Sequence, residues 1–102
     1  MNEAPINFSK NSAVIVRLHE QDNVAIAMAP LAAAKSIENY NLTTAAEIPR
    51  GHKIALREIK AGEHIRKYGQ IIGAASQDIR AGDHVHTQNL SMADFERDYA
   101  YS

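Results

Sequence analysis

One seven-residue pattern, Ile-x-x-Gly-x-x-[Ile/Val], recurs three times in this 102-residue chain, at residues 48–54, 59–65 and 79–85. Glycine adopts positive φ without steric cost, so each copy is typical of an extended segment, a tight turn and a second extended segment. A degenerate copy at residues 31–37 has Ala34 in the glycine position, where positive φ is costly. The repeats predict many short strands linked by turns rather than helices.

The segments around the repeats fit the same architecture. Alternating apolar residues at 14–19 and an apolar run at 24–28 predict two strands, which the turn-forming residues 20–23 join into a hairpin. Asp22 and Asn23 are interpreted as formers of that hairpin turn. We expect one more short strand over residues 37–42.

The predicted fold class is therefore all-β, a domain of short strands and glycine turns. A turn or bulge is expected at Tyr68-Gly69, with a brief strand after it. The repeat glycines are predicted in turns and the apolar ends of the repeats in the core: Gly51, Gly62 and Gly82 in the first group, and Ile48, Ile54, Ile59, Ile65, Ile79 and Val85 in the second.

Composition restricts the partners and the kind of site. The chain has 11 basic and 12 acidic residues and no long basic run, so neither nucleic acid nor an anionic membrane is the expected partner. It has no cysteine, which excludes disulfides and thiolate zinc sites. No apolar run has the length of a membrane span, and we expect a cytoplasmic protein. A chain this short has little room for a deep catalytic cleft.

Three regions are predicted along the chain. Residues 1–12 have few apolar anchors and are expected to form a flexible N-terminal arm, followed by the β domain at residues 13–89. Residues 90–102 are predicted to be a linker or a short C-terminal helix toward a catalytic domain that this chain lacks. Ser91 and Asp94 have the spacing of a capping box, and the apolar residues after Ser91 fall near one helical face.

Five short motifs carry a resemblance to a known family. They are Asp-Asn-Val-Ala at 22–25, Arg-Gly-His-Lys-Ile-Ala-Leu at 50–56, Lys-Tyr-Gly at 67–69, Ile-Gly at 72–73 and Ala-Gly-Asp-His-Val-His at 81–86. In this order they resemble the N-terminal SAF domain of the altronate and galactarate dehydratases, which has a β-clip fold. Several motifs in the right order are more specific than any one of them.

The resemblance covers residues 14–99, and its last part is more similar to the altronate branch. It implies a domain or small subunit of a hydro-lyase that converts altronate to 2-keto-3-deoxy-gluconate and water. It also implies a catalytic domain or large subunit as partner, with iron(II) bound there, outside this chain. This chain alone is not expected to be catalytic. The alternative is a free-standing SAF-type module that binds carbohydrate or protein without chemistry.

Four residues at glycine turns are candidates for binding the substrate carboxylate. His52 and Lys53 follow one turn, and Lys67 and Tyr68 precede another. A dehydratase must stabilise the charge that develops next to the carboxylate, and cations beside exposed backbone amides do this. The alternative is that both lysines are solvated strand ends and that Tyr68 lies at the edge of the core.

His84 and His86 are candidate metal ligands. They stand two apart in a predicted strand, so both rings point to one face, as metal ligation requires. A third ligand would have to come from His52, His64 or a carboxylate elsewhere in the chain. Without it, His84 and His86 are simply part of a polar strand face.

Overall fold

The computed structural model describes residues 14–92, which form nine short strands and one three-residue 3₁₀ helix. In these residues no helix exceeds one turn, which confirms the all-β prediction. None has the length and apolarity that a membrane span needs. The elements are β1 (Ile15–Val16), β2 (Val24–Ala27), β3 (Ser36–Ile37), η1 (Glu38–Tyr40), β4 (Leu42–Thr43), β5 (Lys53–Ala55), β6 (His64–Lys67), β7 (Gln70–Ala75), β8 (His84–Val85) and β9 (Leu90–Ser91).

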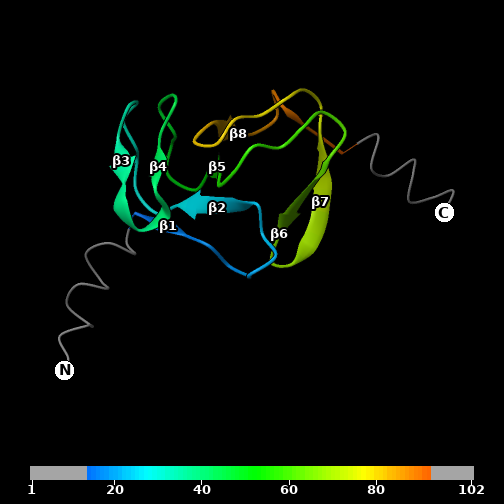
Figure 1. Ribbon diagram of the computed structural model, residues 1–102, viewed down its shortest axis with the longest axis horizontal. Coiled ribbons are helices and arrows are strands. Elements are labelled where there is room, and N and C mark those ends of the chain that lie inside the picture. Colours follow the sequence, from blue (N-terminus) through cyan, green and yellow to red (C-terminus); the bar gives the residue numbers. More distant parts are fainter. Residues whose placement is uncertain (1–13, 93–102) are drawn as a thin grey trace, which may run out of the picture.

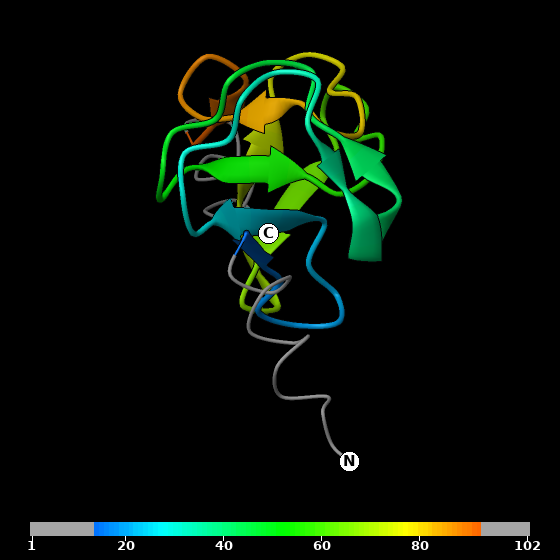
Figure 2. The same ribbon diagram turned by 90° about the vertical axis from the view of Figure 1, so that its left-hand side faces the viewer.

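A four-stranded antiparallel sheet in the order β1-β2-β5-β8 forms the centre of the domain. The β3–β4 hairpin lies on one side of it and the β6-β7-β9 sheet on the other, as Figure 1 shows. In the view of Figure 2, strands β2, β5 and β8 are stacked above one another, and the β3–β4 hairpin lies beside them. The central sheet therefore separates two small cores.

The two cores contact opposite faces of the central sheet. Along β5, Ile54 belongs to the core beneath β3–β4, and its neighbour Ala55 belongs to the core beneath β6 and β7. On β2, Ala25 likewise belongs to the core beneath β3–β4 and its neighbour Val24 to the core beneath β6 and β7. This follows from the period of two in a strand, which sends successive side chains to opposite faces.

The repeats account for both cores. Every apolar repeat position is buried, and an isolated antiparallel bridge joins the copies in pairs, Leu31 with Ile48 and Ile59 with Ile79. The repeat glycines have φ of 85°, 87° and 92°, and in each turn the residue after glycine donates its amide to the carbonyl three residues earlier. This is the arrangement of a type II turn. Ala34 adopts φ of 62°, so the degenerate copy has a repeat turn in spite of its side chain.

The structure corrects the prediction in three segments. Residues 37–42 do not form one strand: Ile37 ends β3, η1 follows, and Asn41 turns the chain with φ of 51° into β4. The predicted strand at 14–19 is reduced to the two residues of β1, which pair with β2 as the predicted hairpin requires. Leu90 and Ser91, placed in the linker by sequence, form β9. Residues 93–102 of the predicted linker or helix and the N-terminal arm at residues 1–12 lie outside the described residues.

Asp22 and Asn23 do more than form the first hairpin turn, which corrects their interpretation. Both are 3% exposed. The Asp22 carboxylate accepts the amides of Tyr68 (2.9 Å) and Gly69 (2.7 Å), which form the two-residue β6–β7 turn, both with positive φ. Asn23 pairs with β6, accepting the Arg66 amide at 2.8 Å and donating to the His64 carbonyl at 3.0 Å. These two side chains attach the β6–β7 hairpin to the central sheet.

Candidate functional site

Three histidines that are far apart in the sequence meet at one edge of the central sheet. Nδ1 of His52 lies 2.8 Å from Nε2 of His84. The His52 ring is stacked on the rings of His86 and His84, with centroids at 4.0 and 5.1 Å. One ring nitrogen from each residue can be chosen so that all three lie within 4.8 Å of one another. Among residues 14–92 this is the one such group of potential metal ligands.

Strand pairing explains why these rings meet. His84 in β8 pairs directly with Ile54 in β5, so their side chains share a face of the sheet. His52 precedes Ile54 by two residues and therefore points to that face as well. Its carbonyl accepts the Ala27 amide at 2.9 Å, which continues the pairing beyond β5. Two adjacent strand ends thus present His52 and His84 side by side.

The loop after β8 places the third histidine. Asn89 is buried and donates to the His84 carbonyl at 2.8 Å, and its side-chain oxygen accepts the His86 amide at 3.0 Å. The amides of Asn89 and Leu90 in turn donate to the His86 carbonyl. The backbone therefore turns sharply after Val85, and His86 is held over His52 by hydrogen bonds within its own loop.

The turn that carries His52 differs from its relatives in a way that frees the side chain. In the last two repeats the residue after glycine is acidic and caps the turn: Glu63 accepts the Lys60 amide at 2.9 Å, and Asp83 accepts the Arg80 amide at 2.8 Å. In the repeat at 48–54 the corresponding amide position is Pro49, which has no N–H to cap. A histidine can therefore stand in the capping position and face outward.

The candidate lysines Lys53 and Lys67 lie within electrostatic reach of each other, and Lys53 also of His84 and His86. Burial first, and then the positive charge of Lys67, lower the pKa of Lys53. Within residues 14–92, none of the ion pairs involves either lysine. The three that are present join Arg57 or Lys60 to carboxylates. Lys53 and Lys67 thus form a pair of cations without a carboxylate to balance them.

Lys53 also acts on the histidines. The pKa of His84 is lowered first by desolvation and then by the charges of His52, His86 and Lys53. Desolvation, His52 and Lys53 lower the pKa of His86 in the same way. Each shift disfavours the imidazolium form, so at neutral pH these two rings are held neutral. Neutral imidazole is the form that binds metal ions and accepts protons.

Tyr68 and His64 are not part of this cluster. Tyr68 is 64% exposed at the tip of the β6–β7 turn, which Asp22 holds near the start of β2, whereas the His52 turn is bonded to its end. The two turns are therefore separated by the length of β2. The charge of Lys67, at the end of β6, nevertheless acts on Lys53. His64 lies on β6 and is not among the three grouped histidines.

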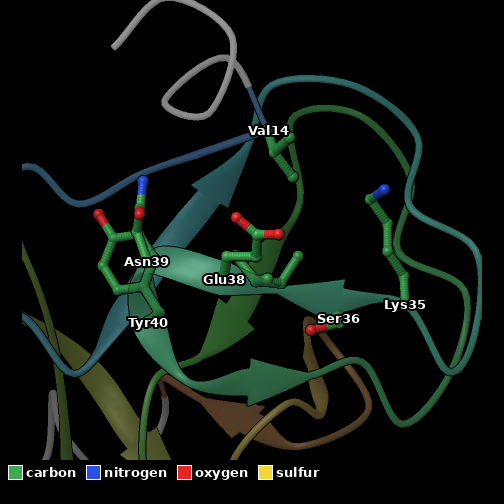
Figure 3. Close-up of a pocket in the computed structure, with 7 residues that line it drawn as sticks. Val14, Lys35, Ser36, Glu38, Asn39 and Tyr40 are labelled. Carbon is green, nitrogen blue, oxygen red and sulfur yellow. The ribbon is translucent and has the colours of Figure 1, made fainter. Parts of the chain in front are cut away.

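A separate hollow of about 310 Å³ lies next to the β3–β4 hairpin. Figure 3 shows its wall, with Val14 on one side and Lys35, Glu38 and Tyr40 along β3 and η1. It contains none of the candidate residues and carries one acidic and one basic side chain. Its composition indicates no particular chemistry, and the histidine edge remains the candidate site.

The described part of the chain coincides with a known domain. The family model described as the altronate/galactarate dehydratase SAF domain matches residues 13–93. The chain belongs to this SAF domain family. It is similar to altronate dehydratase of Escherichia coli (strain K12), with 45% identity over 90 residues, and of Bacillus subtilis (strain 168), with 42% over 91 residues. These alignments cover 84% and 85% of this chain and 18% of each dehydratase.

A small subunit of another lyase is similar to the same SAF domain. The chain is 47% identical over 51 residues to (2R)-sulfolactate sulfo-lyase subunit alpha of Paracoccus pantotrophus. This alignment covers 50% of the chain and 76% of that subunit. Relatives of this SAF domain therefore occur both as a minor part of a long enzyme and as a small subunit.

The geometry gives the SAF domain two chemical capacities. Its paired lysines can bind an anion, since an ammonium group donates charge-assisted hydrogen bonds to carboxylate oxygens. Its three grouped imidazoles can hold a metal ion or exchange protons with a bound molecule. The sequence identified every member of both groups, but it left His52 as one of several options for the third ligand. The missing signal was Pro49, whose significance depends on knowing the capping bonds of the other repeats.

Proposed function

We propose that this SAF domain binds the carboxylate of a hydroxy-acid substrate and closes over the active site of a lyase. Its partner in this proposal is a catalytic domain of the same polypeptide or a large subunit, with iron(II) in the assembled enzyme. The comparisons support an association with dehydratases and related lyases. The substrate class and the covering role are our inference from the site.

The observation that carries the proposal is the Lys53 and Lys67 pair. Burial first, and then the charge of Lys67, disfavour the charged form of Lys53, and an anion bound between the two lysines would offset this cost. No carboxylate among residues 14–92 forms an ion pair with either one. An anionic ligand would supply the missing charge. Perturbed cations of this kind are more common at functional sites than elsewhere.

The relatives suggest which anion this is. Altronate, galactarate and (2R)-sulfolactate, named in the family and its relatives, are all carboxylates with a hydroxyl group on the neighbouring carbon. Eliminating water or sulfite from such a molecule requires removal of a proton and stabilisation of the negative charge that develops. Lysines on the carboxylate would favour that charge. We take altronate as the first substrate to test.

The proposal is tested by binding and then by activity. The chain is titrated with altronate and with a neutral polyol of the same length, and backbone amide signals are followed by NMR. We expect altronate alone to shift the signals of Lys53 and Lys67. In the assembled enzyme, Lys53→Met and Lys67→Met should each lower kcat/KM by roughly ten- to a hundredfold, the loss of one charge-assisted hydrogen bond.

Two controls make the result specific. Lys35→Met removes an exposed cation of the β3–β4 hairpin and should leave kcat/KM unchanged, and Tyr68→Phe tests whether the phenol takes part. If altronate and the polyol bind equally, and both lysine variants keep full activity, the domain does not bind the substrate carboxylate. It would then be a docking module without a direct part in the chemistry.

A further inference from the structure

We propose that His52, His84 and His86 form a site for one divalent first-row transition-metal ion, with coordination positions left open for an anionic oxygen ligand. The proposal places a metal in the SAF domain itself, whereas the family resemblance places iron in the catalytic partner. It stands on the histidine geometry and holds whether or not the lysines bind a substrate.

The distances agree with a shared ion. Imidazole nitrogens bind such ions at about 2.1 Å, so two ligands at a right angle are about 3.0 Å apart and two opposite ligands about 4.2 Å apart. His52 and His84 already have ring nitrogens 2.8 Å apart, and the three chosen nitrogens lie within 4.8 Å. The proposal requires the His86 ring to turn so that its nitrogen comes within range of the same ion.

The surroundings also agree with a metal site. The Gln88 amide lies 3.2 Å from Nδ1 of His84, on the side of the ring away from His52. If that amide turns its oxygen toward Nδ1–H, it holds Nε2 ready for the ion, the usual arrangement around a ligating histidine. Asn89 fixes the backbone on both sides of Val85.

Chemistry limits the ion and its other ligands. Three imidazoles suit zinc, cobalt, nickel or ferrous iron and do not suit magnesium or calcium, which prefer oxygen. Three neutral ligands leave the full charge of the ion, and Lys53 nearby adds to it. An anion should therefore bind together with the metal. A 2-hydroxy carboxylate can supply two oxygens to open positions of one ion.

The test is a titration of the metal-free 102-residue chain with Co(II), followed by its visible absorption and by calorimetry. We expect one ion per chain, with a spectrum of nitrogen and oxygen ligation. His52→Ala, His84→Ala and His86→Ala should each weaken binding by at least about tenfold, the lower range for disturbed metal sites. His64→Ala is the matched control and should bind as the wild type does.

Further measurements separate a lost ligand from a lost fold. Far-UV circular dichroism and the metal-free Tm show whether each variant folds. Co(II) should raise the Tm of the wild type and of His64→Ala, but not of the variants at His52, His84 and His86. Altronate should alter the Co(II) spectrum; Lys53→Met should retain the metal and lose this effect. Absence of stoichiometric binding to the wild type, or an equal loss in His64→Ala, overturns the metal site. Metal binding without an altronate effect counts against the proposed function alone.

Discussion

Gly62 and Gly82 occupy the same position in successive repeats but should respond differently to the same substitution. Their φ values are 87° and 92°, so alanine is strained at both. A Cβ on Gly62 would meet no atom within 4 Å. A Cβ on Gly82 would lie 2.0 Å from the carbonyl oxygen of Thr43, in the segment formed by the end of β4 and the residues after it. That segment is fixed nearby, because the Ala45 amide donates to the Gly82 carbonyl at 3.0 Å.

The magnitudes follow from these contacts. Left-handed backbone costs alanine about 1–2 kcal/mol relative to its normal conformation, which is the whole effect expected for Gly62→Ala. Gly82→Ala adds a backbone clash, and overpacking of this kind costs about 1–3 kcal/mol or more. For a domain of this size each kcal/mol lowers the Tm by roughly 4–8 °C. Gly82→Ala should therefore be about twice as destabilising, or prevent folding.

Urea and thermal unfolding, followed by circular dichroism, measure this difference. Gly51→Ala is a matched control, because its φ is 85° and no atom lies within 4 Å of a Cβ there. It should behave as Gly62→Ala does. Equal losses of stability at Gly62 and Gly82 would refute the reasoning, since they would mean that the approach of Thr43 to Gly82 has no energetic weight.

Two further predictions concern the turns. Asn89→Ala should cost about 1–3 kcal/mol, because it leaves the half-buried His86 amide without its partner while Gln88 still donates to the His84 carbonyl. It should also weaken Co(II) binding because it releases the backbone of His84 and His86; unfolding and Co(II) titrations check both effects. Hydrogen bonds from Arg57 and the Lys60 amide lower the pKa of Glu63. The contribution of ionised Glu63 to stability is therefore fully present above its unfolded pKa of about 4.5, and it is lost as the pH falls through the lower pKa of the folded state. Glu63→Gln should lower the Tm at pH 7, and the difference in Tm from the wild type should vanish in acid. An unchanged Tm at pH 7 would contradict the prediction.

The fold could be predicted because one short pattern determines most of it. Each repeat combines a glycine requirement with two buried apolar residues, so local turn chemistry and core burial favour the same structure. The degenerate copy was harder, since alanine at positive φ is unfavourable taken alone. Its turn forms because Leu31 pairs with Ile48 and both ends of the copy are buried. Tertiary contacts there outweigh a local preference.

Long-range hydrogen bonding accounts for what could not be predicted. Asp22 and Asn23 have the composition of a hairpin turn, but their side chains bind amides more than forty residues away in β6 and its turn. Nothing in the local sequence specifies that partner. For the same reason the sequence, which grouped Tyr68 with His52 at one carboxylate site, did not reveal that their turns are separated. Both turns contain glycine, and only the register of β2 shows that they lie at opposite ends of that strand.

The histidine site arises where the repeat departs from its own rule. In the copies at 59–65 and 79–85 an acidic residue after glycine caps an exposed amide, so the side chain serves the turn. Pro49 removes that amide in the copy at 48–54, so the turn there has no such donor to cap. The side chain after Gly51 is then not needed to cap the turn, and the residue at this position is His52. Because β5 pairs with β8, the released side chain lies beside His84, and the loop held by Asn89 brings His86 over both. A single loss of a backbone donor thus permits three distant histidines to share one edge of the sheet.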